Sequence, residues 1–130
     1  MNIITFGTFD MFHIGHLNIL ERAKELGGTL TVGVSSDALN FSKKQRNPIC
    51  DEIDRMRIVA ALACVDHVFL EESLELKAEY IQKYKADYLV MGDDWQGRFD
   101  HLSHLCKVVY LPRTPAISTT MLIEIVKEIR

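Results

Sequence analysis

The stretch "NIITFGTFDMFHIGH" (residues 2–16) decides the fold, because it joins an apolar strand to a helix through a turn led by glycine. The run over 2–6 is short, apolar and ended by Gly7, a residue that lets the chain turn sharply off a strand. Residues 14–26 then carry apolar side chains at helical spacing, with charged residues between them. We therefore predict a strand over 2–6, followed by a loop and a helix over 14–26.

The alternation of strand and helix continues along the chain. Further strands are expected at 29–34, 65–70, 87–91 and 107–111. Further helices are expected at 51–64, 73–86 and 118–129, with a single helical turn at 101–105. Ser73 and Ser118 are predicted to cap the helices that they begin. The polar segment 35–48 ends in Pro48 and is predicted to be a loop with a broken helical turn.

Strands that alternate with helices are typical of a parallel sheet covered by helices on both faces. We therefore predict an α/β fold, a Rossmann-like doubly wound five-stranded parallel sheet in a single domain over residues 1–130. Ligands of such sheets bind beyond the carboxyl ends of the strands. This rule selects four loops as candidates for the functional site, at 7–13, 35–47, 92–98 and 112–118.

The composition restricts the class of function. Of the 130 residues, 48% are hydrophobic and 25% are charged, and the net charge is −3. An acidic balance argues against a nucleic-acid partner, although a local cleft can still be basic. The apolar runs are too short to span a bilayer, and the start of the chain lacks the pattern of a signal peptide. We expect a cytoplasmic protein without membrane insertion.

The cysteines give no sign of a metal site. Cys50, Cys64 and Cys106 are odd in number and widely spaced, and no two of them have the spacing of zinc ligands. We expect reduced thiols and no protein ligands to a metal.

His13 and His16 lie one helical turn apart at the start of the first predicted helix, so they share one face. Their ring N–H groups could hold two oxygens of one polyphosphate, and a helix N-terminus favours an anion at the same place. Two alternatives are open at this point. The histidines could be unrelated, one packed and one exposed, or they could begin a zinc site, for which no third ligand is evident.

The other three loops carry groups suited to a phosphorylated ligand. The second has the cations Lys43, Lys44 and Arg46, which form either a solvated basic run or a phosphate clamp. The third has Gly92, Asp93, Asp94 and Trp95, which could meet a ribose, a metal or a base, or serve only capping and packing. The fourth has Arg113, Thr114, Ser118, Thr119 and Thr120, an arginine followed by a helix N-terminus rich in hydroxyls.

Two motifs together resemble a known family. "HIGH" (13–16) matches the H-x-G-H motif of the nucleotidyltransferase superfamily, and "RTPAISTT" (113–120) resembles the R-T-x-G-I-S-T-T motif of its cytidylyltransferase branch. "MGDDWQGRFD" (91–100) is similar to the corresponding segment of bacterial glycerol-3-phosphate cytidylyltransferases. Class I aminoacyl-tRNA synthetases share H-x-G-H, but they are much longer and carry a K-M-S-K-S loop that is absent here.

The resemblance implies transfer of CMP from CTP to glycerol 3-phosphate, giving CDP-glycerol and pyrophosphate. It implies Mg²⁺ bound mainly through the CTP phosphates, a homodimer, and a place in the supply of wall or capsule polymer precursors such as those of teichoic acid. When the family's functional residues are placed on the matching positions of this sequence, the implied catalytic residues are His13, His16, Lys43 and Arg113. The acceptor would meet Lys43 and Lys77. The CTP-binding residues would be Thr8, Phe9, Ile14, Gly15, Arg46, Gly92, Asp94, Thr114, Ile117, Ser118, Thr119 and Thr120.

Three positions depart from the family pattern. Ala116 replaces a glycine of the late motif, while Ala63 and Leu74 stand where the compared enzymes carry arginine and tryptophan. The acceptor is therefore open to other small phosphates, such as another polyol phosphate, phosphocholine or phosphoethanolamine. The alignment with the family needs a one-residue gap near residues 44–50. It is therefore open whether Lys44 or Arg46 makes the second phosphate contact.

Two readings outside the cytidylyltransferases are weaker. An adenylyltransferase would commonly have proline where this chain has Met11. A non-catalytic nucleotide-binding module would be expected to lose a histidine or Arg113, and all three are present.

Overall fold

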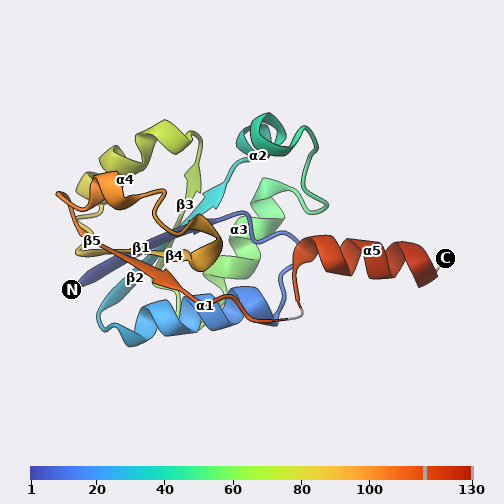
Figure 1. Cartoon of the computed structure of the whole chain (residues 1–130), viewed down its shortest axis with the longest axis horizontal. Coiled ribbons are helices and arrows are strands. Elements are labelled where there is room, and N and C mark those ends of the chain that lie inside the picture. The colour runs from blue at the N-terminus through green and yellow to red at the C-terminus, as the bar shows by residue number, and fades with distance from the viewer. Residues whose placement is uncertain (116, 130) are drawn as a thin grey trace.

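A five-stranded parallel sheet forms the centre of the molecule (Figure 1). The computed structural model describes residues 1–115 and 117–129. The strands, in chain order, are β1 (Asn2–Gly7), β2 (Thr29–Ser35), β3 (His67–Glu71), β4 (Tyr88–Gly92) and β5 (Lys107–Leu111). In space their order is β3-β2-β1-β4-β5, and every pair runs parallel. The predicted α/β sheet is therefore confirmed.

Helices cover both faces of this sheet. They are α1 (Ile14–Glu25), α2 (Asp37–Lys44), α3 (Glu52–Ala60), α4 (Lys77–Lys83) and α5 (Thr119–Ile129). The described residues also form the short 3-10 helices η1 (Leu74–Leu76), η2 (Asp93–Trp95) and η3 (Asp100–Leu102). In Figure 1, α1 and α4 lie on opposite sides of the sheet, and α5 extends away from it. No helix among the described residues is both long and apolar enough to cross a membrane.

The core divides into two apolar layers, because successive side chains of a strand point to opposite faces of the sheet. Ile3 belongs to the layer that contains Leu20 and Ala23 of α1. Its neighbour Ile4 belongs to the opposite layer, with Ile81 of α4. All of these side chains are essentially inaccessible to solvent. The sheet is thus doubly wound, as the alternating pattern predicts.

The strand order places a switch point at the centre of the sheet. β1 has β2 on one side and β4 on the other, so the chain leaves the ends of β1 and β4 in opposite directions. The carboxyl edge of such a sheet opens into a crevice at this point. The loops after β1, β2, β4 and β5 all begin at that edge.

One predicted loop is in fact a helix. Within 35–48 the structure has α2, which begins after Ser36, whose Oγ accepts a hydrogen bond from the Leu39 N–H at 3.0 Å. Leu39 and Asn40 are buried, and burial of this one face stabilises a segment that looks polar overall. Gln45 ends the helix in the left-handed conformation, with φ 57°.

Other boundaries differ by less. The helix expected at 73–86 is a 3-10 turn capped by Ser73, followed by the shorter helix α4. The predicted cap at Ser118 is confirmed, because its Oγ accepts from the Met121 N–H at 3.1 Å. The single turn expected near 101–105 is η3. Ala116, one of the departures from the family pattern, lies outside the described residues.

Candidate active site

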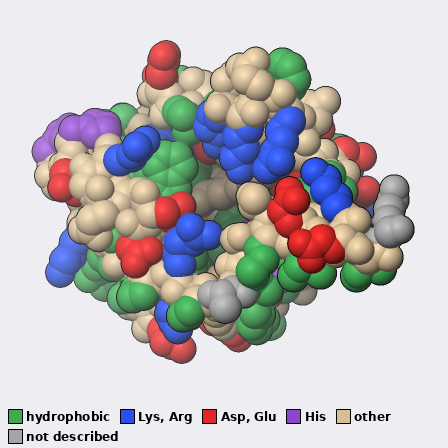
Figure 2. Space-filling model, turned by 45° about the vertical axis from the view of Figure 1, so that its right-hand side comes forward, with side chains coloured by type: hydrophobic (Ala, Val, Ile, Leu, Met, Phe, Trp, Pro, Cys, Tyr) green, Lys and Arg blue, Asp and Glu red, His purple; other side chains and the backbone are tan. Residues whose placement is uncertain are grey.

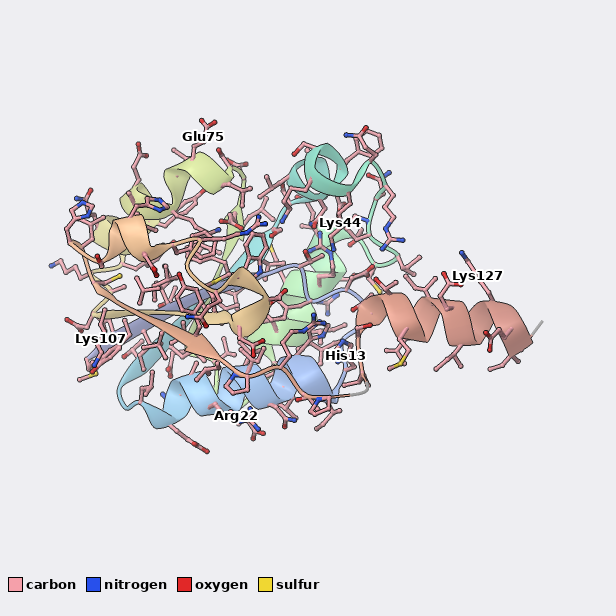
Figure 3. The ribbon with its side chains drawn as sticks, viewed as in Figure 1. His13, Arg22, Lys44, Glu75, Lys107 and Lys127 are labelled. Atoms are coloured by element: carbon pink, nitrogen blue, oxygen red, sulfur yellow. The ribbon has the colours of Figure 1, made fainter. Side chains whose placement is uncertain are left out.

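A cavity of about 520 Å³ opens at the carboxyl edge of the sheet, a size typical of small-molecule sites. All four loops selected from the sequence contribute to its walls. Figure 2 shows a hollow in the surface that is bordered by Lys and Arg side chains. Figure 3 shows His13 at the start of α1 and Lys44 at the end of α2, two elements that meet this cavity.

The cavity gathers nearly all of the residues that the sequence selects. Those lining it are Thr8, Phe9, His13, Gly15, His16, Lys43, Lys44, Arg46, Lys77, Gly92, Asp94, Arg113, Thr114, Ile117, Ser118, Thr119 and Thr120. Ile14 does not line it, and its side chain is half exposed. Lys44 and Arg46 both line it and are both exposed, so either can contact a phosphate. Leu74 lines the cavity, whereas Ala63 is an exposed residue away from it.

The two histidines cap their own helix. The Gly15 N–H donates to His13 Nδ1 at 3.0 Å, and the His13 N–H donates to His16 Nδ1 at 3.2 Å. This is the reciprocal arrangement of a capping box, with imidazoles in place of the usual hydroxyl and carboxylate. Two backbone N–H groups that the start of a helix leaves without partners are satisfied in this way. The caps fix both rings at the mouth of α1.

These caps also set the proton positions on the rings. A backbone N–H can only donate, so each Nδ1 must accept, and the proton of each neutral ring then resides on Nε2. Burial lowers the pKa of His13, and the nearby charge of Arg113 lowers it further. Burial also lowers the pKa of His16 to about 3, helped by His13 and opposed by Asp10. Both rings are therefore neutral near pH 7, with Nε2–H as their free donor.

Tight packing leaves room only for glycine beside these rings. A Cβ on Gly15 would lie 2.8 Å from Cε1 of His13, and a Cβ on Gly7 would lie 2.7 Å from Cζ of Phe9. Phe9 itself has φ 55°, an uncommon conformation for a non-glycine residue. Its ring meets that of His16 edge to face, with centroids 5.4 Å apart. The backbone conformation of this loop thus supports the position of His16.

Asp10 joins the first loop to two distant segments. Its carboxylate accepts hydrogen bonds from the backbone N–H groups of Ile49 and Cys50, both at 2.8 Å. Its carbonyl oxygen accepts from the Thr119 hydroxyl at 2.8 Å. Asp10 is buried, so these contacts are sheltered from water. The residue therefore holds together the loops that follow β1, α2 and β5.

Arg55 of α3 is the largest fully buried side chain among the described residues. Its guanidinium donates to the carbonyl oxygens of Cys50, Thr8 and Ser35 and to the carboxylate of Asp37, at 2.7–2.9 Å. Three of the cavity's segments therefore meet at one side chain. A buried arginine is stable only when its donors are satisfied in this way.

Further contacts fix the remaining loops. The Thr8 hydroxyl donates to Oδ1 of Asn40 at 2.7 Å, which ties the first loop to α2. Asn18 of α1 donates to the Thr114 hydroxyl at 2.9 Å, which ties α1 to the loop after β5. Gly92 lies close to Arg113, because a Cβ there would be 3.8 Å from Cγ of Arg113.

A second charged group lines the cavity at the carboxyl end of β3. Lys77 Nζ is paired with the buried carboxylate of Glu71, and the half-buried Lys43 also faces the cavity. Burial lowers the pKa of Lys43, and the charge of Lys77 adds to this while Glu71 opposes it. The two lysines that the resemblance assigns to the acceptor therefore line the same cavity.

Four residues organise the site: Asn40, Arg55 and Glu71, which the sequence reasoning missed, and Asp10, which it placed in the first loop without a role. Their role is visible only in their burial, since each is a polar residue less than 10% exposed. Arg55 in particular looks like one more charge on an amphipathic helix. The sequence signal for Asp10 is its place in the loop after Gly7, between the first strand and the first helix.

Comparisons with known proteins identify the family of the chain. A family model described as cytidylyltransferase-like matches residues 4–125. A glycerol-3-phosphate cytidylyltransferase of Bacillus spizizenii is 47% identical over 92% of this chain and 92% of its own length. Its counterpart from Staphylococcus aureus is 40% identical over 91% of this chain and 89% of its own length.

A similar solved structure is a lipopolysaccharide core biosynthesis protein from Thermoplasma volcanium. Its TM-score is 0.74 at 25% identity, and the match covers 88% of this chain and 98% of that one. The two relatives above match this chain in sequence over about nine tenths of both lengths. The chain belongs to the cytidylyltransferase-like family.

Proposed function

We propose that this protein transfers CMP from CTP to glycerol 3-phosphate, which gives CDP-glycerol and pyrophosphate. The observation that carries the proposal is the pair of neutral rings of His13 and His16, whose Nε2–H donors are fixed beside Arg113. Such an array suits the phosphates of a nucleotide. The similarity to enzymes named glycerol-3-phosphate cytidylyltransferase supports the nucleotide and the acceptor.

The charge of the cavity differs from that of the chain. Although the net charge is −3, six cations line the cavity among the residues that the structure describes: Lys43, Lys44, Arg46, Lys77, Arg113 and Lys127. The N-terminal ends of helices α1 and α5 also form part of the cavity wall. A helix N-terminus favours an anion, so both elements add to the attraction for a triphosphate.

The reaction needs no covalent intermediate on the protein. A phosphate oxygen of the acceptor attacks the α-phosphorus of CTP, and the bond from that phosphorus to the β-phosphate oxygen breaks. Pyrophosphate leaves with the electron pair. His13, His16 and Arg113 stabilise the negative charge that develops on the phosphoryl oxygens, while Lys43 and Lys77 hold the acceptor phosphate. Catalysis is then positioning and charge stabilisation.

The histidines act in this scheme as hydrogen-bond donors and not as proton shuttles. Each Nδ1 is engaged with the backbone, so a ring could accept a second proton only by breaking its cap. By analogy with other preorganised donors, each ring accounts for a rate factor of about 10²–10³.

The acceptor end of the cavity favours a polyol phosphate over a phosphorylated amine. The ammonium groups of Lys43 and Lys77 would attract a phosphate and repel the cationic head of phosphocholine or phosphoethanolamine. Leu74 also lines this end in place of the tryptophan of the compared enzymes and offers only an aliphatic wall. Glycerol 3-phosphate fits these constraints, because its hydroxyls are neutral.

Magnesium is proposed to arrive with the nucleotide and to neutralise the charge of the leaving pyrophosphate. Within residues 1–115 and 117–129, no group of three His, Cys, Asp or Glu side chains could hold a metal ion. The buried carboxylates at the cavity already have protein partners, Ile49 and Cys50 for Asp10 and Lys77 for Glu71. The donor set therefore suits an ion that is held mainly by phosphate oxygens.

The homodimer and the cytoplasmic location stay predictions. Sedimentation equilibrium of the purified chain measures the first, and fractionation of cells that produce it measures the second. Supply of wall or capsule precursors such as teichoic acid is likewise proposed on the likeness to the named relatives.

Release of pyrophosphate tests the proposed function. CTP and ATP are each offered with Mg²⁺ and with glycerol 3-phosphate, another polyol phosphate, phosphocholine or phosphoethanolamine. We expect turnover with CTP and glycerol 3-phosphate. Turnover with CTP and only another acceptor would change the substrate but keep the chemistry. Turnover with ATP alone, or CTP binding without any turnover, would overturn the proposal in favour of an adenylyltransferase or a binding module.

A further inference from the structure

Glu71 is a buried carboxylate in the cavity for which the proposed reaction has no use. It is the last residue of β3, it lines the cavity, and it is 1% exposed. Its Oε1 accepts a hydrogen bond from the Ser35 hydroxyl at 3.2 Å, and its Oε2 accepts from Nζ of Lys77. Ser35 and Glu71 are register partners in neighbouring strands, so the sheet itself fixes where this carboxylate lies.

Lys77 is held from more than one side. It is the first residue of α4 and only 4% exposed, although lysine is rarely buried. Its Nζ lies 4.1 Å from the ring centroid of Phe6 and 5.4 Å from that of Phe99. The aromatic faces and Glu71 together restrict a side chain that is ordinarily flexible. The ammonium is thereby presented to the cavity in one orientation.

The charged form of Lys77 is favoured by the carboxylate of Glu71. Burial lowers the pKa of Lys77, and Glu71 opposes this effect. The neighbouring Lys43 of α2 is affected in the same way, because burial and the positive charges of Lys77, Lys44 and Arg55 lower its pKa while Glu71 raises it. Glu71 is thus the carboxylate that favours the charged form of both Lys43 and Lys77.

We propose that Glu71, itself held by Ser35, is a positioning residue for the acceptor, and that it keeps Lys77 charged and directed at the acceptor phosphate. The inference rests on the proposed function, because it assigns a role within the same site. Glu71 acts through Lys77 and not on the substrate, since both of its oxygens already have partners and a carboxylate repels a phosphate.

Replacement of Glu71 by glutamine tests this role, because the amide keeps the shape of the side chain and removes its charge. Glu72→Gln is the matched control, since the same change is made at the next residue, whose side chain is exposed. Ser35→Ala is a milder second variant that removes one of the two hydrogen bonds to the carboxylate. Each variant is assayed for the KM of each substrate, for kcat, for the Kd of CTP and for thermal stability.

We expect Glu71→Gln to raise the KM for glycerol 3-phosphate about 10- to 100-fold, the effect of losing one charge-assisted hydrogen bond. The Kd of CTP stays within twofold of the wild type, and Ser35→Ala shifts the KM for the acceptor in the same direction by a smaller factor. The alkaline limb of kcat/KM for the acceptor moves to lower pH in Glu71→Gln, because Lys77 loses the charge that raises its pKa. Glu72→Gln behaves as the wild type.

An unchanged KM for the acceptor in Glu71→Gln, or an unmoved alkaline limb, overturns the inference while the proposed function stands. Equal losses toward both substrates with lowered thermal stability would show a structural role only and overturn it as well. If Glu71→Gln does not fold, an unchanged acceptor KM in Ser35→Ala overturns it. Absence of turnover in the wild type overturns the proposed function first, and this inference with it.

Discussion

His13 and His16 stack with their ring centroids 3.8 Å apart and their planes inclined by 23°, while both Nδ1 atoms cap the helix that carries them. Two protonated rings at this distance would repel each other and lose their caps. The arrangement therefore requires neutral imidazoles, and it leaves two Nε2–H donors side by side at the cavity. Helix capping and the proposed stabilisation of the phosphates thus depend on the same two side chains.

Substitution of His13 separates these two roles. Asparagine can still cap the helix through its side-chain oxygen but has no Nε2–H donor in the same place, whereas alanine loses both. We expect both variants to lose about 10²–10³ in kcat. Only His13→Ala should also lose about 1 kcal/mol in the free energy of unfolding. Steady-state kinetics and urea titration measure the two effects.

His104→Asn is the control for this experiment, because His104 is an exposed histidine away from the cavity. It should retain activity and stability. Wild-type kcat in His13→Asn would contradict the role of the ring as a donor.

Stability should fall as the medium becomes more acidic. The pKa of His16 is lowered from 6.5 to about 3 in the folded protein, so between these values the unfolded chain binds a proton that the folded chain does not. The contribution of His16 is complete above pH 6.5 and is lost as the pH falls toward 3. Urea titrations at neutral pH and within this window measure the slope.

The variant His16→Asn isolates the contribution of this ring, because asparagine does not titrate. It should show a shallower loss of stability over the same window than the wild type. Equal pH dependence in the two proteins would mean that His16 is not kept neutral by the fold.

Arg55 should matter for stability through its four hydrogen-bonded partners. Replacement by methionine removes the arginine donor from the carbonyls of Thr8, Ser35 and Cys50 and the ion pair from the Asp37 carboxylate, and among the described residues only Ser35 keeps another side-chain donor, Asn40. We expect Arg55→Met to lower the free energy of unfolding by about 3–5 kcal/mol. Arg57→Met is the control on the exposed face of the same helix, and it should stay within about 0.5 kcal/mol of the wild type. Similar losses in both variants would contradict the assignment.

Magnesium should be needed for turnover but not for folding. A chelator in excess is expected to abolish pyrophosphate release, and added Mg²⁺ should restore it. The melting temperature without nucleotide should be unchanged by the chelator, because the described residues offer no metal cage. A large drop in the melting temperature on chelation would point to a structural metal instead.

The histidines, Arg113 and the hydroxyls after it could be found from sequence because they follow strands, and the carboxyl ends of parallel strands share one edge. The alternation of β-branched strands with amphipathic helices was sufficient to predict the sheet. Periodicity and capping involve residues that are close in the chain, so the strands and helices that depend on them can be predicted from the sequence.

The residues that join the loops could not be found in the same way. Arg55 contacts Thr8, which is 47 positions away in the chain, and Asp10 contacts Cys50, which is 40 positions away. Their burial follows from tertiary packing, which a one-dimensional pattern does not encode. Helix α2 was missed for a related reason. Ser36 is a good cap, and Lys43 and Lys44 suit a helix end, but the buried face consists of little more than Leu39 and Asn40.

Phosphorus NMR of the complete reaction tests the central claim most directly. The protein is mixed with CTP, Mg²⁺ and glycerol 3-phosphate whose phosphate oxygens are labelled with the heavy isotope ¹⁸O. We predict a new pair of coupled diphosphate signals from CDP-glycerol, a labelled oxygen at the bridge and unlabelled pyrophosphate, with the same signals growing about 10²–10³ times more slowly in His16→Asn. CTP that stays intact, or pyrophosphate formed without a CDP-linked product, would contradict the account.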